Sequence, residues 1–294
     1  MSDTVRRVSY IFLCSVPLLV SVVVGVRAFR IPGVYQALGV TLFAAIGVAA
    51  WTLGARAIRA GAEPERRMAL VGGLLLLPFA LVSLLWVGLG TPAAATPAEN
   101  KMRFLVLLVD SIAVTGGFVV LEQALHEAGE RFYLGLGAVA NILAGAAYLV
   151  WASFHLGGFV LEVRDGQRET LPAVLSPSEV FDPLLFIACV LTYLATLTFA
   201  VCMGRVGWLG RGTTRVYVLA NLVALVALMI RGVSYPDPMA GSTPWYIYPG
   251  FVAGIPIVPW IMPLLLGVVV LRRATPSGRW HGGRTDTRFH SRAR

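Results

Sequence analysis

Charged side chains are scarce in this chain. Only 13% of its 294 residues are Asp, Glu, Lys or Arg, whereas 57% are hydrophobic. Soluble globular proteins average about 25% charged residues, so the composition excludes an ordinary soluble domain. Lysine is nearly absent, because Lys101 stands alone beside 23 arginines. Lys101 lies outside the apolar runs, which also excludes a retinal Schiff base, since that linkage needs a lysine within a membrane span.

Cysteine and histidine are rare as well, with three and four copies. The three cysteines lie in apolar runs and form no CxxC pair, so neither a disulfide framework nor a zinc site is expected. His126 and His155 fall at opposite ends of one apolar run and cannot ligate the same haem. Nucleotide-binding motifs and the GxSxG elbow are missing from the sequence. We therefore predict no metal, no cofactor and no catalytic residue.

Long apolar runs dominate what is present. Eight of them reach the roughly 17–25 residues that a helix needs to cross a bilayer. They cover residues 8–26, 34–55, 68–90, 104–125, 132–155, 183–204, 214–231 and 249–271. We predict an all-α, polytopic transmembrane helix bundle of about eight spans that forms a single domain over residues 1–273. Residues 274–294 form a basic tail that is predicted to be disordered.

The basic residues divide unequally between the two sides of these spans. With eight spans both termini share one side, which carries 17 of the 24 basic residues. The other side carries seven, including Lys101 and Arg103, which we assign to the external loop 91–103. The positive-inside rule then places both termini in the cytoplasm, and we expect the plasma (inner) membrane of a bacterium. The partners expected are the lipid bilayer and, through the basic tail, anionic lipid or another protein, but not nucleic acid.

The last apolar run contains Pro256, Pro259 and Pro263. Each interior proline removes a backbone donor and clashes with the preceding turn. In hydrocarbon the freed carbonyl groups need partners in protein or trapped water. The last span is therefore predicted to be broken by proline and to face protein or a wet cavity.

Two helix starts share one pattern on the external side. Thr96–Pro97–Ala98–Glu99 precedes the fourth span and Ser176–Pro177–Ser178–Glu179 precedes the sixth. Both patterns predict a capping box with proline at the first helical position. Thr243–Pro244 precedes the last span without the glutamate.

Asp110 is the polar residue that most directly suggests a function, because burying a charge within a span is costly. It lies six residues into the fourth span, and three interpretations stay open. Asp110 could brace a neighbouring helix, it could handle a ligand or a proton, or it could be exposed to water. Arg231, at the external end of the seventh span, could extend its long side chain outward or pair with Asp110. Such a pair, at the depth of Pro256 and Pro259, would form a polar pocket that opens outward.

Aromatic residues gather near the external boundary, where membrane proteins carry a belt of Trp and Tyr. Trp86 and Trp151 are expected in that belt. Trp245 belongs either to the belt or to the mouth of a binding site. Trp260 lies within the last span between two prolines, which favours a place in the pocket wall.

Small and amide residues predict helix contacts. Gly137, Asn141 and Gly145 are spaced four apart in the fifth span, so they share one face. Small residues allow close approach of helices, and an asparagine on that face can bond across the contact. Asn221 in the seventh span is interpreted in the same way.

Three functions fit this pattern. The first is a permease-like bundle that binds a small molecule or lipid in its outer half, between the fourth, seventh and eighth spans. The second is a non-catalytic membrane partner or sensor that acts through another protein. The third is a lipid-modifying enzyme with Asp110 as acid or base.

Overall fold

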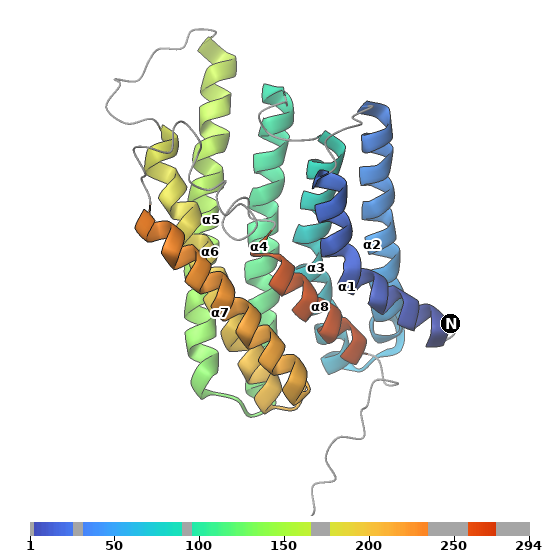
Figure 1. Ribbon diagram of the computed structural model, residues 1–294. Helices are drawn as coiled ribbons and strands as arrows, with labels where there is room; N and C mark the ends of the chain where they lie inside the picture. The colour runs from blue at the N-terminus through green and yellow to red at the C-terminus, as the bar shows by residue number, and fades with distance from the viewer. Residues whose placement is uncertain (1–2, 26–31, 90–95, 166–176, 235–257, 275–294) are drawn as a thin grey trace, which may run out of the picture.

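A computed structural model of the protein describes residues 3–25, 32–89, 96–165, 177–234 and 258–274 (Figure 1). Within these residues the chain folds entirely into helices, which confirms the predicted all-α class. The eight helices are α1 Asp3–Gly25, α2 Pro32–Ala60, α3 Glu63–Leu89, α4 Pro97–Glu127, α5 Phe132–Asp165, α6 Pro177–Arg205, α7 Arg211–Ser234 and α8 Ile261–Arg273.

Six of these helices, α2 to α7, are long and apolar enough to cross a membrane. The chain is therefore a multi-pass membrane protein whose helices contact the lipid bilayer. The described part of α8 has 13 residues, which corresponds to about 20 Å, shorter than a hydrocarbon core of about 30 Å. A count of eight spans stays a prediction. Helix α1 is not among the six candidates, and residues 249–257 of the last predicted span lie outside the described residues.

Capping interactions determine where α4 begins. The Thr96 hydroxyl accepts a hydrogen bond from the Glu99 backbone N–H at 3.3 Å, and the Glu99 carboxylate accepts one from the Thr96 N–H at 2.7 Å. Pro97 occupies the first turn, where no backbone donor is needed. The predicted capping box is confirmed here. Helix α6 begins at Pro177, as its sequence predicts, while Ser176 and Thr243–Pro244 lie outside the described residues.

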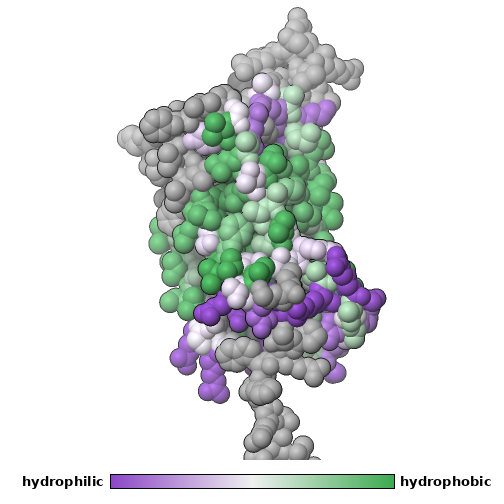
Figure 2. Space-filling view, turned by 90° about the vertical axis from the view of Figure 1, so that its right-hand side faces the viewer, coloured by the Kyte–Doolittle hydropathy of each residue, from purple (hydrophilic) through white to green (hydrophobic). Residues whose placement is uncertain are grey.

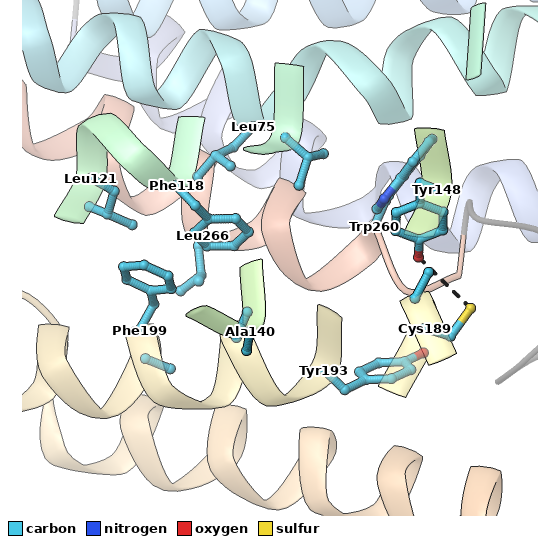
Figure 3. Packing of buried hydrophobic residues seen from close by; sticks show 14 of the residues in the cluster. Leu75, Phe118, Leu121, Ala140, Tyr148, Cys189, Tyr193, Phe199, Trp260 and Leu266 are labelled. Carbon is cyan, nitrogen blue, oxygen red and sulfur yellow. Dashed lines mark hydrogen bonds between the residues drawn. The ribbon is translucent and has the colours of Figure 1, made fainter. Parts of the chain in front are cut away.

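Helices that follow one another in sequence pack side by side from α1 to α7, and α8 then returns to pack mainly against α3. This return places α8 between two hydrophobic cores. Leu266 and Val270 of α8 belong to the larger core, which extends from α3 to α7, whereas Leu264 and Val268 belong to the smaller core with α1, α2 and α3. In Figure 3, Leu266 lies among side chains of the larger core that come from α3, α4 and α6.

The contact between α3 and α8 requires glycine on both helices. A Cβ at Gly72 would lie 2.9 Å from the carbonyl oxygen of Gly267 and would overlap Leu271. A Cβ at Gly267 would lie 2.9 Å from the Cβ of Leu75 and 3.0 Å from the carbonyl oxygen of Gly72. Small residues that let two backbones approach are typical of helix pairs in membranes. These two glycines therefore set the distance between α3 and α8.

The last helix begins just after the proline-rich segment. Residues 258–260 form a turn, and α8 starts at Ile261 with Pro263 in its first turn. A proline in the first turn removes no helical hydrogen bond. Within the described residues, Pro259 and Pro263 thus mark the start of a helix and do not interrupt one. Pro256 lies outside the described residues.

Arginines are concentrated at the end of the bundle where α1, α3, α5 and α7 begin and α2, α4, α6 and α8 end; we call it the arginine-rich end (Figure 1). Its described arginines are Arg6, Arg7, Arg56, Arg59, Arg66, Arg67, Arg131, Arg205, Arg211, Arg215, Arg272 and Arg273. Figure 2 shows hydrophilic residues at this end and a broad hydrophobic band above them. That distribution matches a bundle whose apolar middle lies in the bilayer.

Ion pairs hold helix ends together at the arginine-rich end. The Arg67 guanidinium is 2.9 Å from the Glu127 carboxylate, and both side chains are exposed. The Arg205 Nε is 2.5 Å from the carboxylate of Glu130, whose side chain is only 5% exposed. Burial raises the pKa of Glu130, but the hydrogen bond and charge of Arg205, with two backbone N–H donors, outweigh that effect. The pKa of Glu130 therefore lies below its ordinary value.

We expect Gly72→Ala to destabilise the protein by about 1–3 kcal/mol, because the added methyl group meets a backbone carbonyl that cannot move aside. Gly73→Ala is the matched control, since nothing lies within 4 Å of a Cβ at Gly73. Thermal unfolding of both variants in detergent measures the difference. Equal unfolding temperatures for the two variants would contradict the close approach of α3 and α8.

The Glu130 ion pair predicts a pH dependence of stability. Its carboxylate is more acidic in the folded than in the unfolded state, so it adds stability above the unfolded pKa of about 4.3. This stability is lost as the pH falls through the folded pKa. Between about pH 5 and about pH 2, Glu130→Gln should flatten the decline in unfolding temperature, whereas Glu127→Gln, in the exposed pair, should not. Identical pH profiles for the wild type and Glu130→Gln would disprove this contribution.

Candidate functional site

Arg103 and Asp110 occupy one face of α4. They are seven residues apart, which is close to two helical turns, so their Cα atoms lie about 10 Å apart along the helix axis. Arg103 is 1% exposed and Asp110 is 0% exposed. Within the part of the chain that the structure describes, neither the guanidinium nitrogens nor the carboxylate oxygens have a hydrogen-bond partner. The charge of Glu99, four residues earlier on α4, attracts Arg103. Buried ionisable side chains without hydrogen-bond partners are costly in a membrane helix, so this face is the candidate site.

Arg103 is the site residue that the sequence analysis missed. It was assigned to the loop 91–103, but α4 begins at Pro97 and carries Arg103 into its second turn. The apolar run starts one residue later, at Phe104, so the hydropathy pattern places Arg103 outside the span. Its guanidinium carbon lies 5.3 Å from the ring centre of Trp86 on α3. An arginine at this distance from a tryptophan face gains a cation–π attraction.

Aromatic side chains surround this part of α4. Phe104, next to Arg103, stacks on His155 of α5 at 4.8 Å between ring centroids and meets Trp151 edge-on at 5.3 Å. Trp86 and Trp151 are each only 7% exposed, so they are not part of a lipid-facing belt, and that prediction is wrong. Their position between helices buries the rings against α4 and leaves both indole N–H groups without an acceptor in the described residues.

Asp110 contacts no helix end among the described residues. Its neighbour Ser111 bonds to the Leu107 carbonyl oxygen of the same helix at 2.7 Å, so that hydroxyl is not directed to the carboxylate. Arg231 lies in the last turn of α7, and its side chain is outside the described residues. The pairing of Asp110 with Arg231 therefore stays a prediction.

Trp260 is the described aromatic residue of the proline-rich segment. It is 1% exposed and packs on Tyr148 of α5 with 5.5 Å between ring centroids. Figure 3 shows the Tyr148 hydroxyl directed to Cys189, which accepts a hydrogen bond at 3.8 Å. Tyr148 and Trp151 are three residues apart on α5, which is about one helical turn. Trp260 therefore packs about one turn along α5 from Trp151, one of the aromatic residues near Arg103. Pro259, beside it, is also buried, whereas Trp245 lies outside the described residues.

The small residues of α5 lie at two helix contacts. Asn141 donates a hydrogen bond to the Thr115 carbonyl oxygen of α4 at 3.1 Å. A Cβ at Gly145 would lie 3.2 Å from the Thr115 Cβ, whereas a Cβ at Gly137 would meet Phe199 of α6 at 3.3 Å. Asn141 and Gly145 therefore contact α4, and Gly137 contacts α6.

Asn221 of α7 differs from Asn141 in how its amide is used. It is fully buried, but its amide donates to the Tyr217 carbonyl oxygen of its own helix at 2.7 Å. Its side-chain oxygen has no partner among the described residues. This hydrogen bond therefore stays within α7 and makes no link to another helix.

Two substitutions distinguish an unpaired from a paired buried polar group. Asp110→Asn should leave the unfolding temperature unchanged or raise it, because it removes a buried ionisable group that has no hydrogen-bond partner in the described residues. Asn141→Leu should lower the stability by about 0.6–1.7 kcal/mol, because it removes a hydrogen bond between α5 and α4. Thermal unfolding in detergent measures both. A large destabilisation by Asp110→Asn would show that the carboxylate braces the bundle.

Among the described residues, no group of three or more His, Cys, Asp or Glu side chains is placed to bind a metal ion. Comparison of the chain with known protein families, with curated protein sequences and with solved structures finds no match. The function of the site is therefore inferred from the side chains of this chain.

Proposed function

We propose that the protein is a permease-like bundle that binds a small molecule or a lipid at the Arg103–Asp110 face of α4. The observation that carries this proposal is the burial of one basic and one acidic side chain on one helix face, neither with a hydrogen-bond partner in the described residues. A charge kept in a membrane helix at such a cost is by default a functional group.

The chemistry of this face defines the kind of ligand. Arg103 and the indole N–H groups of Trp86 and Trp151 are donors, so they favour an anionic or hydrogen-bond-accepting group. Asp110 accepts hydrogen bonds and favours a cationic or donating group. The Cα atoms of the two residues are about 10 Å apart along the axis, and the Arg103 guanidinium lies against Trp86. A zwitterion, such as an amino acid or a phosphatidylethanolamine head group, has both charges.

Binding is favoured over acid–base catalysis by the surroundings of Asp110. General acid–base chemistry usually joins two or more titratable groups within hydrogen-bond reach of one another and of the substrate. Among the described residues no such group reaches the Asp110 carboxylate. An acidic and a basic side chain that lie two turns apart on one helix are better suited to holding the two ends of a ligand than to transferring a proton.

The proposed topology follows from the arginine-rich end. By the positive-inside rule this end lies in the cytoplasm, so that both termini are cytoplasmic in a bacterial inner membrane. The Arg103–Asp110 face then lies nearer the external surface. Arg231 and Trp245, whose side chains are outside the described residues, remain the proposed outer members of the site.

The test is ligand-induced stabilisation of the purified full-length protein. Thermal unfolding is measured with a panel of amino acids and with phosphatidylethanolamine, and phosphatidylcholine serves as the reference lipid. A ligand at about 100 times its Kd adds about 2.7 kcal/mol to the folded state, which raises the unfolding temperature measurably. A ligand that raises the unfolding temperature of the wild type should not raise that of Arg103→Gln or of Asp110→Asn.

Arg66→Gln is the matched control, because Arg66 is exposed at the arginine-rich end. It should respond to the probe as the wild type does. Uptake of the same probe into proteoliposomes then distinguishes a permease from a sensor. If the probe stabilises the wild type and both site variants equally, the Arg103–Asp110 face is not the binding site.

A further inference from the structure

A hollow lies at the arginine-rich end, far from Arg103 and Asp110 along the bundle. It has a volume of about 850 Å³ and is formed by the first turns of α1, the end of α8 and the turn between α6 and α7. Its size is within the range of small-molecule sites, about 300–1,000 Å³. We call it the basic pocket, defined by Arg6, Arg7, Arg272, Arg273, Tyr10 and Trp208.

The charge of the basic pocket is strongly unbalanced. Four arginines line it, and Asp3 is the one carboxylate among the described lining residues. Arg6 is the most buried of the four, at 9% exposure. Burial lowers the pKa of Arg6, nearby Arg56 lowers it further, and Asp3 only partly offsets these effects. Like charges brought together in a partly enclosed space attract anions.

Aromatic rings orient the arginines at the end of α8. The Arg272 guanidinium carbon lies 4.5 Å from the ring centre of Tyr10, and that of Arg273 lies 5.8 Å from the ring centre of Trp208. Arg273 also donates to the carbonyl oxygens of Gly207 and Trp208 at 3.2 and 3.3 Å, so it fixes the wall of the pocket. Arg272 also makes a side-chain hydrogen bond with Tyr10. An arginine presents five N–H donors in a planar fork that matches the geometry of phosphate.

The opposite wall of the basic pocket is apolar. Ile11 of α1, Leu53 of α2 and Val269 of α8 line it on the side that leads into the hydrophobic band. A site that joins arginines to an apolar wall, at the border between the band and the polar end, fits a molecule with an anionic head and hydrocarbon tails. Basic pockets between transmembrane helices are known to hold anionic lipid head groups.

We propose that the basic pocket binds the phosphate head group of an anionic membrane lipid. Arg6 and Arg272 contact the phosphate, Arg273 positions the pocket wall, and the acyl chains extend along Ile11 and Val269 into the bilayer. The site shares no lining residue with the Arg103–Asp110 face, and the basic tail 275–294 lies outside the described residues.

The experiment is a lipid titration of the full-length protein followed by native mass spectrometry and thermal unfolding. Phosphatidylglycerol should bind in preference to phosphatidylcholine. The Arg6→Gln/Arg272→Gln variant should bind phosphatidylglycerol at least about 100-fold more weakly, since it removes two charged hydrogen bonds that each contribute on the order of 1.5–3 kcal/mol. The matched control, Arg66→Gln/Arg215→Gln, removes two exposed arginines from the same end and should bind as the wild type does.

A measurement on the unmodified protein keeps the proposal testable if the double variant does not fold. Raising the salt from about 0.1 M to about 1 M shortens the screening length from about 10 Å to 3 Å, so phosphatidylglycerol binding should weaken while phosphatidylcholine binding does not. Inorganic phosphate is the second probe. If phosphate saturates the pocket and phosphatidylglycerol shows no preference over phosphatidylcholine, the ligand is a soluble phosphate and the lipid proposal is overturned. Equal losses in the pocket and control variants overturn it as well.

Discussion

The close approach of α3 and α8 at Gly72 and Gly267 is the contact on which the arrangement of the other helices depends. It lets the last helix lie between two cores, so that Leu266 and Leu264 pack on different sets of partners. A larger residue at either glycine would move α8 outward. The smaller core around α1 and α2 would then lose the wall that separates it from the larger one, and the pocket at the arginine-rich end would lose one side.

The two proposed sites use charge in different ways. At the Arg103–Asp110 face, one positive and one negative group are buried along a single helix, with aromatic rings around the positive one. At the basic pocket, positive groups from two helices meet at the polar border of the hydrophobic band, with a carboxylate only from Asp3. The first arrangement suits a ligand with both charges within the bundle, and the second suits an anion that approaches from the membrane surface.

Local signals in the sequence predicted local structure well. The capping box at Thr96 and Glu99 was found because both partners lie within one turn, and the helices were found because apolar runs of span length leave few alternatives. The burial of Asp110 was also predictable, because it lies within an apolar run. Arg103 was missed because it precedes that run by one residue. Its spacing of seven residues from Asp110 was the signal that could have found it.

Features that depend on which helices meet were not predictable. Trp86 and Trp151 have the positions of belt residues along their helices, but the rotation of α3 and α5 directs them inward. The basic pocket joins residues near position 6, position 208 and position 272, and no pattern in the sequence indicates that these segments meet. These segments meet because α8 returns to pack against α3. That contact needs Gly72 and Gly267, which the sequence pattern does not distinguish from the other glycines of the chain.

The position of α8 also gives the bundle a mechanical property. Its described residues form a single short rod with Trp260 at one end, against Tyr148, and Arg272 at the other, against Tyr10. A shift of this rod along its axis changes both contacts together, although they are on the order of 20 Å apart. If occupancy of the basic pocket shifts the rod, it also changes the packing beside the aromatic residues around Arg103. Thermodynamic reciprocity then requires that a ligand there alters lipid affinity by the same factor.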